Sequence, residues 1–126
     1  MIKEGCLFCD ISEDRIVTDN MFAVAIYDNY PVTPYHTLII PKRHVINFFD
    51  LTKEEMKDVF ELLKEVKNRV LSKDDRITGW NVGVNVLEDA GQTIMHVHIH
   101  LIPRRKGDME DPRGGVRGVI PEKQSY

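Results

Sequence analysis

Histidines alternate with apolar residues in one stretch of the chain, between Thr93 and Pro103. The order is Met95, His96, Val97, His98, Ile99, His100 and Leu101. This alternation predicts a β-strand, because successive side chains of a strand point to opposite faces of its sheet. We therefore expect one face to bury an apolar row in a core. The other face would present three imidazoles in a row.

The spacing of this row limits how it could bind a metal ion. On a strand, residues two apart are separated by about 6.6 Å and residues four apart by about 13 Å. Ligand atoms of one zinc ion lie only about 2 Å from the metal. His96 and His100 therefore cannot readily share an ion. A metal site made from an adjacent pair of histidines, or from one histidine and ligands elsewhere in the chain, is still feasible.

The row suits chemistry at a phosphorus atom. Neutral imidazole is a competent nucleophile near neutral pH, because its unperturbed pKa is about 6.5. Neighbouring imidazoles also disfavour being protonated together, which helps to keep one of them neutral. One histidine could attack phosphorus while its neighbours bind the developing oxyanion or the leaving group. The segment Gly91-Gln92-Thr93, just upstream, adds backbone amides and polar side chains for phosphate oxygens.

The two cysteines, Cys6 and Cys9, form a Cys-x-x-Cys pair. A structural disulfide is not expected in a cytosolic chain. A thioredoxin-like redox pair should follow a strand, and nothing strand-like precedes these residues. Two readings stay open from the spacing alone. The pair is either half of a metal site that needs two further ligands, or two incidental thiols.

Length and composition exclude several classes of protein. We expect the 126 residues to form a single domain over 1–126, with residues 104–126 as a charged, glycine-rich C-terminal tail. No apolar run approaches the roughly 20 residues that span a bilayer, and no signal-peptide core is seen near the N-terminus. These features predict a cytoplasmic protein without a membrane partner. The net charge of -3 and the lack of a basic stripe argue against a nucleic-acid partner.

The remaining periodic segments predict an α+β fold. We expect strands over residues 21–27, 37–40 and 79–86, a short helical turn within 44–50, and a long helix from a capping box at Thr52 to about Ser72. Apolar residues at helical spacing run from Met56 to Val70. Residues 1–20 show no strong periodicity. With the histidine strand these segments give four strands, and we predict an antiparallel sheet of about five strands in all, packed against one long helix and a short one.

The strand predicted over residues 79–86 also has two unlike faces. Trp80, Val82, Val84 and Val86 would face a core, whereas Asn81, Gly83 and Asn85 would face the other way. If this strand pairs antiparallel with the histidine strand, the asparagine face and the histidine face become one polar surface. Such a surface would offer amide hydrogen bonds and space for a ligand.

The segment from His96 to Ile102 resembles the His-x-His-x-His-x-x pattern of the histidine triad (HIT) family of nucleotide hydrolases and transferases. Three flanking segments are similar to the family as well: Cys6 to Ile11, Pro34 to Pro41, and Ala90 to Thr93. The resemblance implies a HIT-like fold and a zinc-containing, bacterial-type nucleotide hydrolase. It also implies a homodimer whose two sheets join across the interface.

The resemblance further implies a role for each residue of the site. His98 would be the nucleophile that forms a nucleotidyl-histidine intermediate, which water then cleaves. His100 would contact the α-phosphate or the bridging oxygen, and His36 would support His98 through hydrogen bonds. Asp28 would bind the ribose hydroxyls. Asn85, Gln92 and Thr93 would lie on the phosphate side of the nucleotide.

The resemblance also supplies the two ligands that the cysteine pair lacks. A structural zinc ion would be held by Cys6, Cys9, His44 and His96. The expected substrate carries an AMP moiety, as in dinucleoside polyphosphates such as diadenosine tetraphosphate. Two alternatives stay open: a phosphoramidase acting on adenosine or other nucleoside phosphoramidates, and a non-catalytic module that binds purine nucleotides.

Overall fold

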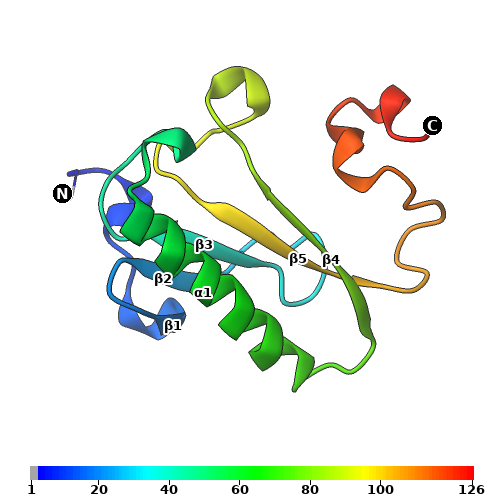
Figure 1. The fold of residues 1–126 in the computed structure, drawn as a ribbon, viewed down its shortest axis with the longest axis horizontal. Coiled ribbons are helices and arrows are strands. Elements are labelled where there is room, and N and C mark those ends of the chain that lie inside the picture. The colour runs from blue at the N-terminus through cyan, green and yellow to red at the C-terminus, as the bar shows by residue number, and fades with distance from the viewer. Residues whose placement is uncertain (1–2) are drawn as a thin grey trace.

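The computed structural model describes residues 3–126. Five strands form one antiparallel sheet in the order β1-β2-β3-β5-β4. They are β1 (Ile16–Asp19), β2 (Ala23–Tyr27), β3 (Thr37–Pro41), β4 (Ile77–Val84) and β5 (Ile99–Arg105). One long helix, α1 (Lys53–Leu71), packs against the sheet (Figure 1). The predicted α+β architecture is confirmed.

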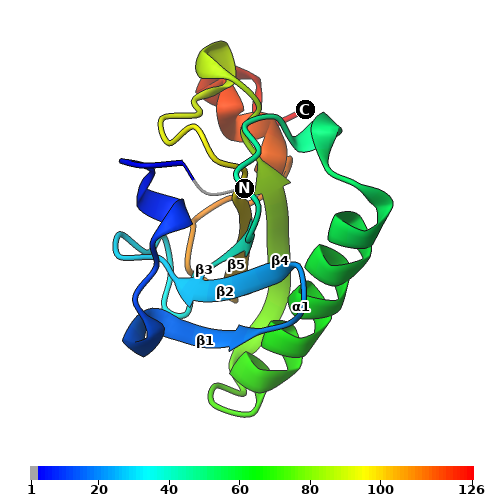
Figure 2. The ribbon, with the colours of Figure 1, turned by 90° about the vertical axis from the view of Figure 1, so that its left-hand side faces the viewer.

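The two faces of the sheet are covered by different segments, as Figure 2 shows. Ala23, Ala25 and Ile39 belong to a core cluster with the buried face of α1. Val24 and Ile26, one position along, belong to a second cluster around Phe8 of the N-terminal segment. This division follows from strand alternation, because neighbouring side chains of β2 point to opposite faces. Both faces of the sheet centre are therefore buried.

Helix α1 begins at the predicted capping box. The Thr52 hydroxyl accepts a hydrogen bond from the Glu55 amide at 3.1 Å, and the Glu55 carboxylate accepts one from the Thr52 amide at 2.9 Å. The helix ends at Leu71, close to the predicted end at Ser72. The prediction that Met56 and Phe60 belong to the buried face was wrong, because both side chains are exposed. The residues of α1 that pack on the sheet are Val59, Leu62, Val66 and Val70.

The histidine strand is shorter than the alternation predicts. β5 begins at Ile99, so His96 and His98 lie in irregular chain just before it. Continuing the β3–β5 register would place Val97 opposite Pro41, which has no amide hydrogen to donate. The Val97 amide donates instead to the Val45 carbonyl at 2.8 Å. Val97, Ile99 and Leu101 are buried as predicted, but Met95 is 39% exposed and does not join the core.

Several elements differ from the sequence prediction, most of them near the ends of the chain. β1 pairs with β2 although residues 1–20 show no periodicity. β4 starts two residues earlier than predicted. Val82 is exposed, whereas Trp80 and Val84 on the same side of β4 pack against the core cluster that includes α1. β5 runs to Arg105, two residues into the predicted tail. The rest of the tail contains two short 3-10 helices, η5 (Gly115–Val119) and η6 (Pro121–Lys123), of which η5 contacts β4.

Shorter 3-10 segments complete the fold between the strands. They are η1 (Leu7–Cys9), η2 (Glu13–Arg15), η3 (Phe48–Asp50) and η4 (Glu88–Ala90). The η3 turn lies inside the range where a short helical turn is predicted. Within residues 3–126, no helix combines the length and the apolar character needed to cross a bilayer.

Candidate functional site

The histidine face of the sheet is covered by the N-terminal segment instead of being an open polar surface. The Phe8 ring packs edge-on against His98, with ring centroids 5.1 Å apart, and against His96 at 6.2 Å. His96 and His98 are both buried. Alternation predicts correctly that the histidines point away from α1. The element that covers them was missed, because residues 1–20 give no periodic signal.

Hydrogen bonds fix which ring nitrogen of His98 carries the proton. Nδ1 of His98 lies 2.9 Å from the carbonyl oxygen of His96. A carbonyl oxygen can only accept, so Nδ1–H is the donor. In the neutral ring this leaves a lone pair on Nε2. His98 is therefore held as the tautomer whose Nε2 can act as a nucleophile or a base.

A relay of hydrogen bonds fixes the two other histidines on this side. The Val32 amide donates to Nδ1 of His36 at 3.0 Å, so the His36 proton lies on Nε2. That Nε2 is 2.9 Å from Nδ1 of His100 and 3.5 Å from a carboxylate oxygen of Asp28. His100 thus accepts at Nδ1 and carries its own proton on Nε2. The result is an N–H donor next to the His98 ring, with ring centroids 5.4 Å apart.

This relay argues against a metal ion among Asp28, His36 and His100, although donor atoms of the three lie within 4.8 Å of one another. To bind an ion through Nε2, His36 would have to move its proton to Nδ1. That proton would then face the Val32 amide hydrogen. The group is better described as a hydrogen-bond network.

Burial keeps the relay neutral. Desolvation, with smaller contributions from His98 and His36, lowers the pKa of His100 to about 4. Desolvation also lowers the pKa of His36, and the nearby Asp28 carboxylate partly offsets this effect. Both rings are therefore uncharged near neutral pH. The donor and acceptor roles assigned above require this state.

The loop that carries Val32 and His36 is clamped at several points. The Thr33 hydroxyl donates to the Pro103 carbonyl at 2.6 Å, and Arg105 donates to the Pro34 carbonyl at 3.1 Å. Arg105 is itself paired with the buried Asp74 at 2.9 Å. Tyr35, within this loop, has a φ of 71°, a left-handed conformation that costs on the order of 1 kcal/mol. The clamp holds a strained backbone that directs the Val32 amide at His36.

A cavity of about 280 Å³ opens beside the histidines. Its apolar wall includes Leu7, Phe8 and Ile94. Its polar lining includes Asp28, Asn85, Thr93, His98 and His100. An apolar wall with a few convergent polar groups is typical of a small-molecule site. Five residues predicted to contact a nucleotide therefore line one cavity.

Cys6, Cys9, His44 and His96 meet on the other side of His98. Their donor atoms all lie within 4.8 Å of one another, so the group could hold a metal ion. Nδ1 of His96 is 3.3 Å from the Cys6 sulfur and 3.5 Å from the Cys9 sulfur, and Nδ1 of His44 is 3.3 Å from the Cys9 sulfur. Nε2–H of His96 donates to the Pro41 carbonyl at 2.7 Å. The lone pair on Nδ1 of His96 is thereby directed at the sulfurs.

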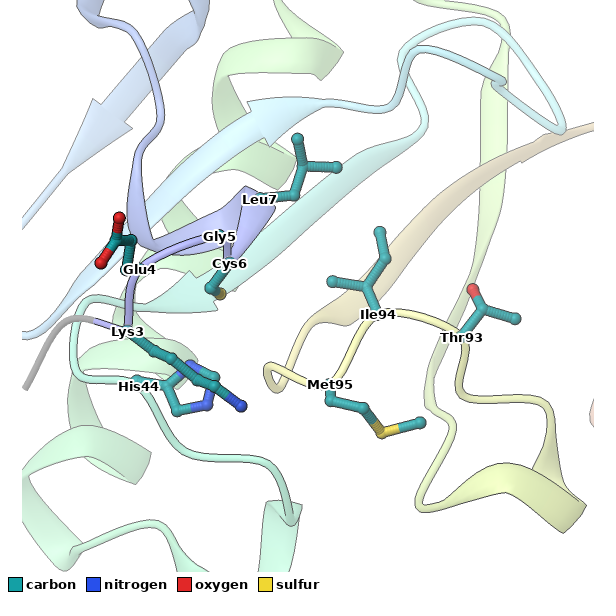
Figure 3. A pocket seen from close by; sticks show the side chains of 9 residues that line it. All are labelled: Lys3, Glu4, Gly5, Cys6, Leu7, His44, Thr93, Ile94 and Met95. Carbon is teal, nitrogen blue, oxygen red and sulfur yellow. The ribbon is translucent and has the colours of Figure 1, made fainter.

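A pocket of about 310 Å³ adjoins this group (Figure 3). Cys6 and His44 line it together with Lys3, Ile94 and Met95. The pocket therefore reaches two of the four donors, and a metal site requires an entry path for its ion. Burial, together with the neighbouring Cys9, raises the pKa of the Cys6 thiol. A cation would have to displace that proton, because the thiolate is the form of cysteine that binds a metal.

Comparison with known proteins agrees with this geometry. Residues 11–107 match the HIT domain family. The chain belongs to the HIT family. Among its relatives is the bis(5'-nucleosyl)-tetraphosphatase (asymmetrical) of Schizosaccharomyces pombe, 41% identical over 81 residues, which are 64% of this chain and 44% of that protein. The bis(5'-adenosyl)-triphosphatase of Dictyostelium discoideum is 36% identical over 101 residues, 80% of this chain and 67% of that protein.

Solved structures of HIT proteins share the fold. The Zn-bound histidine triad family protein from Mycobacterium smegmatis superposes on this HIT protein with a TM-score of 0.74 at 29% identity. The match covers 85% of this chain and 80% of that one. The sheet and helix described above are therefore the HIT fold, and a zinc-bound protein is among its structural neighbours.

One predicted nucleotide-binding residue of this HIT protein lies outside the cavity. Gln92 is buried, and its amide oxygen accepts from the Leu87 amide at 2.7 Å. Its amide nitrogen donates to the carbonyls of Ile46 and Ile94. These bonds use both ends of the Gln92 amide within the protein. Gln92 therefore shapes the loop that leads to Thr93 and does not reach the cavity.

Other lining residues were not predicted. Phe8, Ile94, Arg15 and Asn29 all border the cavity. Arg15 donates to the Tyr27 carbonyl at 3.0 Å and to the Asn29 side chain at 3.1 Å, which holds it beside Asp28. The sequence held no signal for Arg15, because the strand that follows it, β1, was itself not predicted. Phe8 could have been found by asking why a lone aromatic residue stands between two cysteines.

Proposed function

We propose that this HIT protein hydrolyses dinucleoside polyphosphates, such as diadenosine tetraphosphate, at the α-phosphate through a covalent nucleotidyl-His98 intermediate. The main support for the proposal is that His98 and His100 line one cavity and offer complementary ring nitrogens there. His98 has its lone pair on Nε2, and His100 carries an N–H on Nε2. A nucleophile next to a hydrogen-bond donor is the arrangement that displacement at phosphorus needs. The S. pombe and D. discoideum relatives are named as hydrolases of such dinucleotides.

In the first step, Nε2 of His98 attacks the α-phosphorus and forms an N–P bond. The bond between the α-phosphorus and the bridging oxygen breaks, and its electron pair leaves with the polyphosphate. Nε2–H of His100 stabilises the charge that develops on the phosphate or bridging oxygen. Water then attacks phosphorus and loses a proton to solvent, the N–P bond breaks with its electron pair returning to Nε2, and AMP is released with His98 neutral again.

We assign the nucleotide contacts by position in the cavity. The carboxylate of Asp28 is suited to accept hydrogen bonds from ribose hydroxyls, and Asn85 and Thr93 can donate to phosphate oxygens. His36 acts through His100, because its Nε2–H fixes the His100 tautomer. Gln92 is given only an indirect role, through the loop that it holds.

We further propose that zinc is the ion held by Cys6, Cys9, His44 and His96. Two sulfurs and two imidazole nitrogens are a donor set that structural zinc prefers. Bond lengths of 2.3 Å to sulfur and about 2.0 Å to nitrogen place tetrahedral S and N ligands about 3.5 Å apart. The S···N distances of 3.3 to 3.5 Å fit this spacing. The ion would tie the N-terminal segment, with Phe8, to the histidine face.

A homodimer is proposed on the basis of one edge strand. Among residues 3–126, β4 pairs as a strand only with β5, although η5 also contacts it, so a second copy would pair with the part of the β4 edge that η5 leaves uncovered. Two sheets joined at this edge would bury hydrogen-bonding groups that are otherwise left to water. Light scattering of the purified protein would test this by giving its mass in solution.

A substrate panel tests the proposed reaction. Diadenosine tetraphosphate and adenosine phosphoramidate are each incubated with the wild-type protein and with His98→Ala. We expect turnover of the dinucleotide by the wild type alone, with a mass increase of one adenylyl group on His98 after a rapid quench that avoids acid. Preference for the phosphoramidate would assign the protein as a phosphoramidase. Binding without turnover of either compound would make it a nucleotide-binding module.

A further inference from the structure

We propose that the cleft between the sheet and the C-terminal tail binds the leaving half of a dinucleoside polyphosphate, with its second nucleoside covered by η5. This inference rests on the proposed function and deepens it, because it concerns the other end of the same substrate. The cleft has a volume of about 420 Å³. The tail lies beside β4 at the edge of the sheet (Figure 1).

The cleft meets the cavity beside the histidines. His100 and Asn85 line both this cleft and the 280 Å³ cavity, so the two spaces meet at these side chains. The cavity also contains Asp28 and His98, whereas the cleft also contains His36 and Ile102. A phosphate attacked by His98 therefore sits at the junction. One nucleoside lies in the cavity, and the departing part of the substrate enters the cleft.

The lining of the cleft suits a nucleoside better than a bare phosphate chain. Ile102 of β5 forms part of the floor, and Val116 and Val119 of η5 border the opposite side. Val119 is 77% exposed, so an apolar side chain is left to water where a flat base could cover it. Asn81 lies at one end, with its oxygen bound by Arg104 at 2.7 Å, which leaves its NH₂ group to donate.

The tail is held in one conformation by contacts among its own residues. Gly114 has a φ of 87°, and a Cβ there would overlap the Gln124 carbonyl oxygen. The Arg117 guanidinium lies 4.9 Å from the centre of the Tyr126 ring, and its Nε donates to the Lys123 carbonyl at 3.1 Å. These contacts fold residues 113–126 back on themselves and hold η5 in place. The glycines and arginines of the tail thus stabilise its conformation, and they have no part in the proposed reaction at the histidines.

Two neighbouring residues of the tail provide a matched test. Val119 lines the cleft, whereas Ile120 does not, although it is 55% exposed. Val119→Asn should lower kcat/KM for diadenosine tetraphosphate about tenfold, because an apolar contact with the leaving nucleoside is lost. Ile120→Asn should change it less than twofold. Neither substitution should alter kcat/KM for adenosine phosphoramidate, whose leaving group is too small to reach the cleft.

Binding measurements separate this inference from the proposed reaction. In a His98→Ala background, Val119→Asn should weaken binding of diadenosine tetraphosphate about tenfold and leave AMP binding unchanged by calorimetry. If that difference appears but the wild type turns over no substrate, the proposed function is wrong and the cleft assignment holds. Equal effects of Val119→Asn and Ile120→Asn, or equal effects on AMP and the dinucleotide, would overturn the cleft assignment. Absence of any nucleotide binding would overturn both.

Discussion

His96 and His98 are two residues apart on the same face of the chain, yet their surroundings differ in one decisive way. His96 donates from Nε2 to the Pro41 carbonyl, so its Nδ1 lone pair faces the sulfurs of Cys6 and Cys9. His98 donates from Nδ1 to the His96 carbonyl, so its lone pair is on Nε2. Two different backbone carbonyls, those of Pro41 and His96, therefore select opposite tautomers in the two rings. One cluster is thereby suited to a cation and the other to phosphorus.

The proposed metal site and the proposed phosphate site are built from one face of the chain, yet substitutions should affect them separately. The first joins the N-terminal segment to the sheet and should mainly affect stability. The second lies between Phe8 and the Val32–His36 loop and should mainly affect turnover. Substitutions in each cluster test this division.

The largest expected effect is on turnover. His98→Ala removes the nitrogen that would attack phosphorus, so kcat for diadenosine tetraphosphate should fall by about a thousandfold or more. The melting temperature should change by only a few degrees, because the metal cluster is intact. Steady-state kinetics and calorimetry on the same preparation give both numbers. A variant that retained wild-type kcat would remove His98 from the mechanism.

Substitution of a cysteine should have the reverse effect. Cys9→Ser weakens the proposed zinc site, and zinc at a thousandfold excess over its Kd contributes about 4 kcal/mol to the free energy of unfolding. We expect loss of bound zinc by elemental analysis and a melting temperature lower by about 15 °C. Asp10→Ser, next to Cys9 but outside the cluster, is the control. Equal melting temperatures of the wild type with and without a chelator would show that no bound ion stabilises the fold.

Lowering the pH should destabilise the protein through His100. An unfolded histidine has a pKa of about 6.5, whereas burial lowers the pKa of His100 in the fold to about 4. Between these values the unfolded chain binds more protons, so the free energy of unfolding falls as the pH falls. The loss should approach about 3 kcal/mol near pH 4. Urea titrations of wild type and His100→Gln would measure it, and parallel pH profiles would contradict the assignment.

The smallest effect should come from the clamp on the Val32–His36 loop. Arg105→Met removes the donor to the Pro34 carbonyl and the partner of Asp74, so the Val32 amide should point less firmly at His36. We expect kcat to fall several-fold with KM unchanged, and ¹⁵N NMR should show a mixture of His36 tautomers. Arg76→Met is the control, because Arg76 also pairs with Asp74 but is exposed. A single His36 tautomer in both variants would assign Arg105 a purely structural role.

Much of the fold followed from local pattern. The capping box at Thr52 and Glu55, the apolar run of β2 and the burial of Ile99 and Leu101 were all predicted correctly. These features depend on neighbours in the chain, where side-chain period and cap chemistry act directly. The start of β5 was predicted wrongly because it depends on Pro41, a residue of another strand.

The candidate site divides in the same way. The alternation of the histidines and the two cysteines that could accompany them can be read from local residue order. The ring nitrogen that each histidine offers cannot, because it depends on the Pro41 and His96 carbonyls and the Val32 amide in the folded chain. Nor does local order show that Phe8 closes the histidine face and that Gln92 points away from it. A hydrogen-bond partner far away in sequence leaves no periodic trace, yet it fixes where the proton lies.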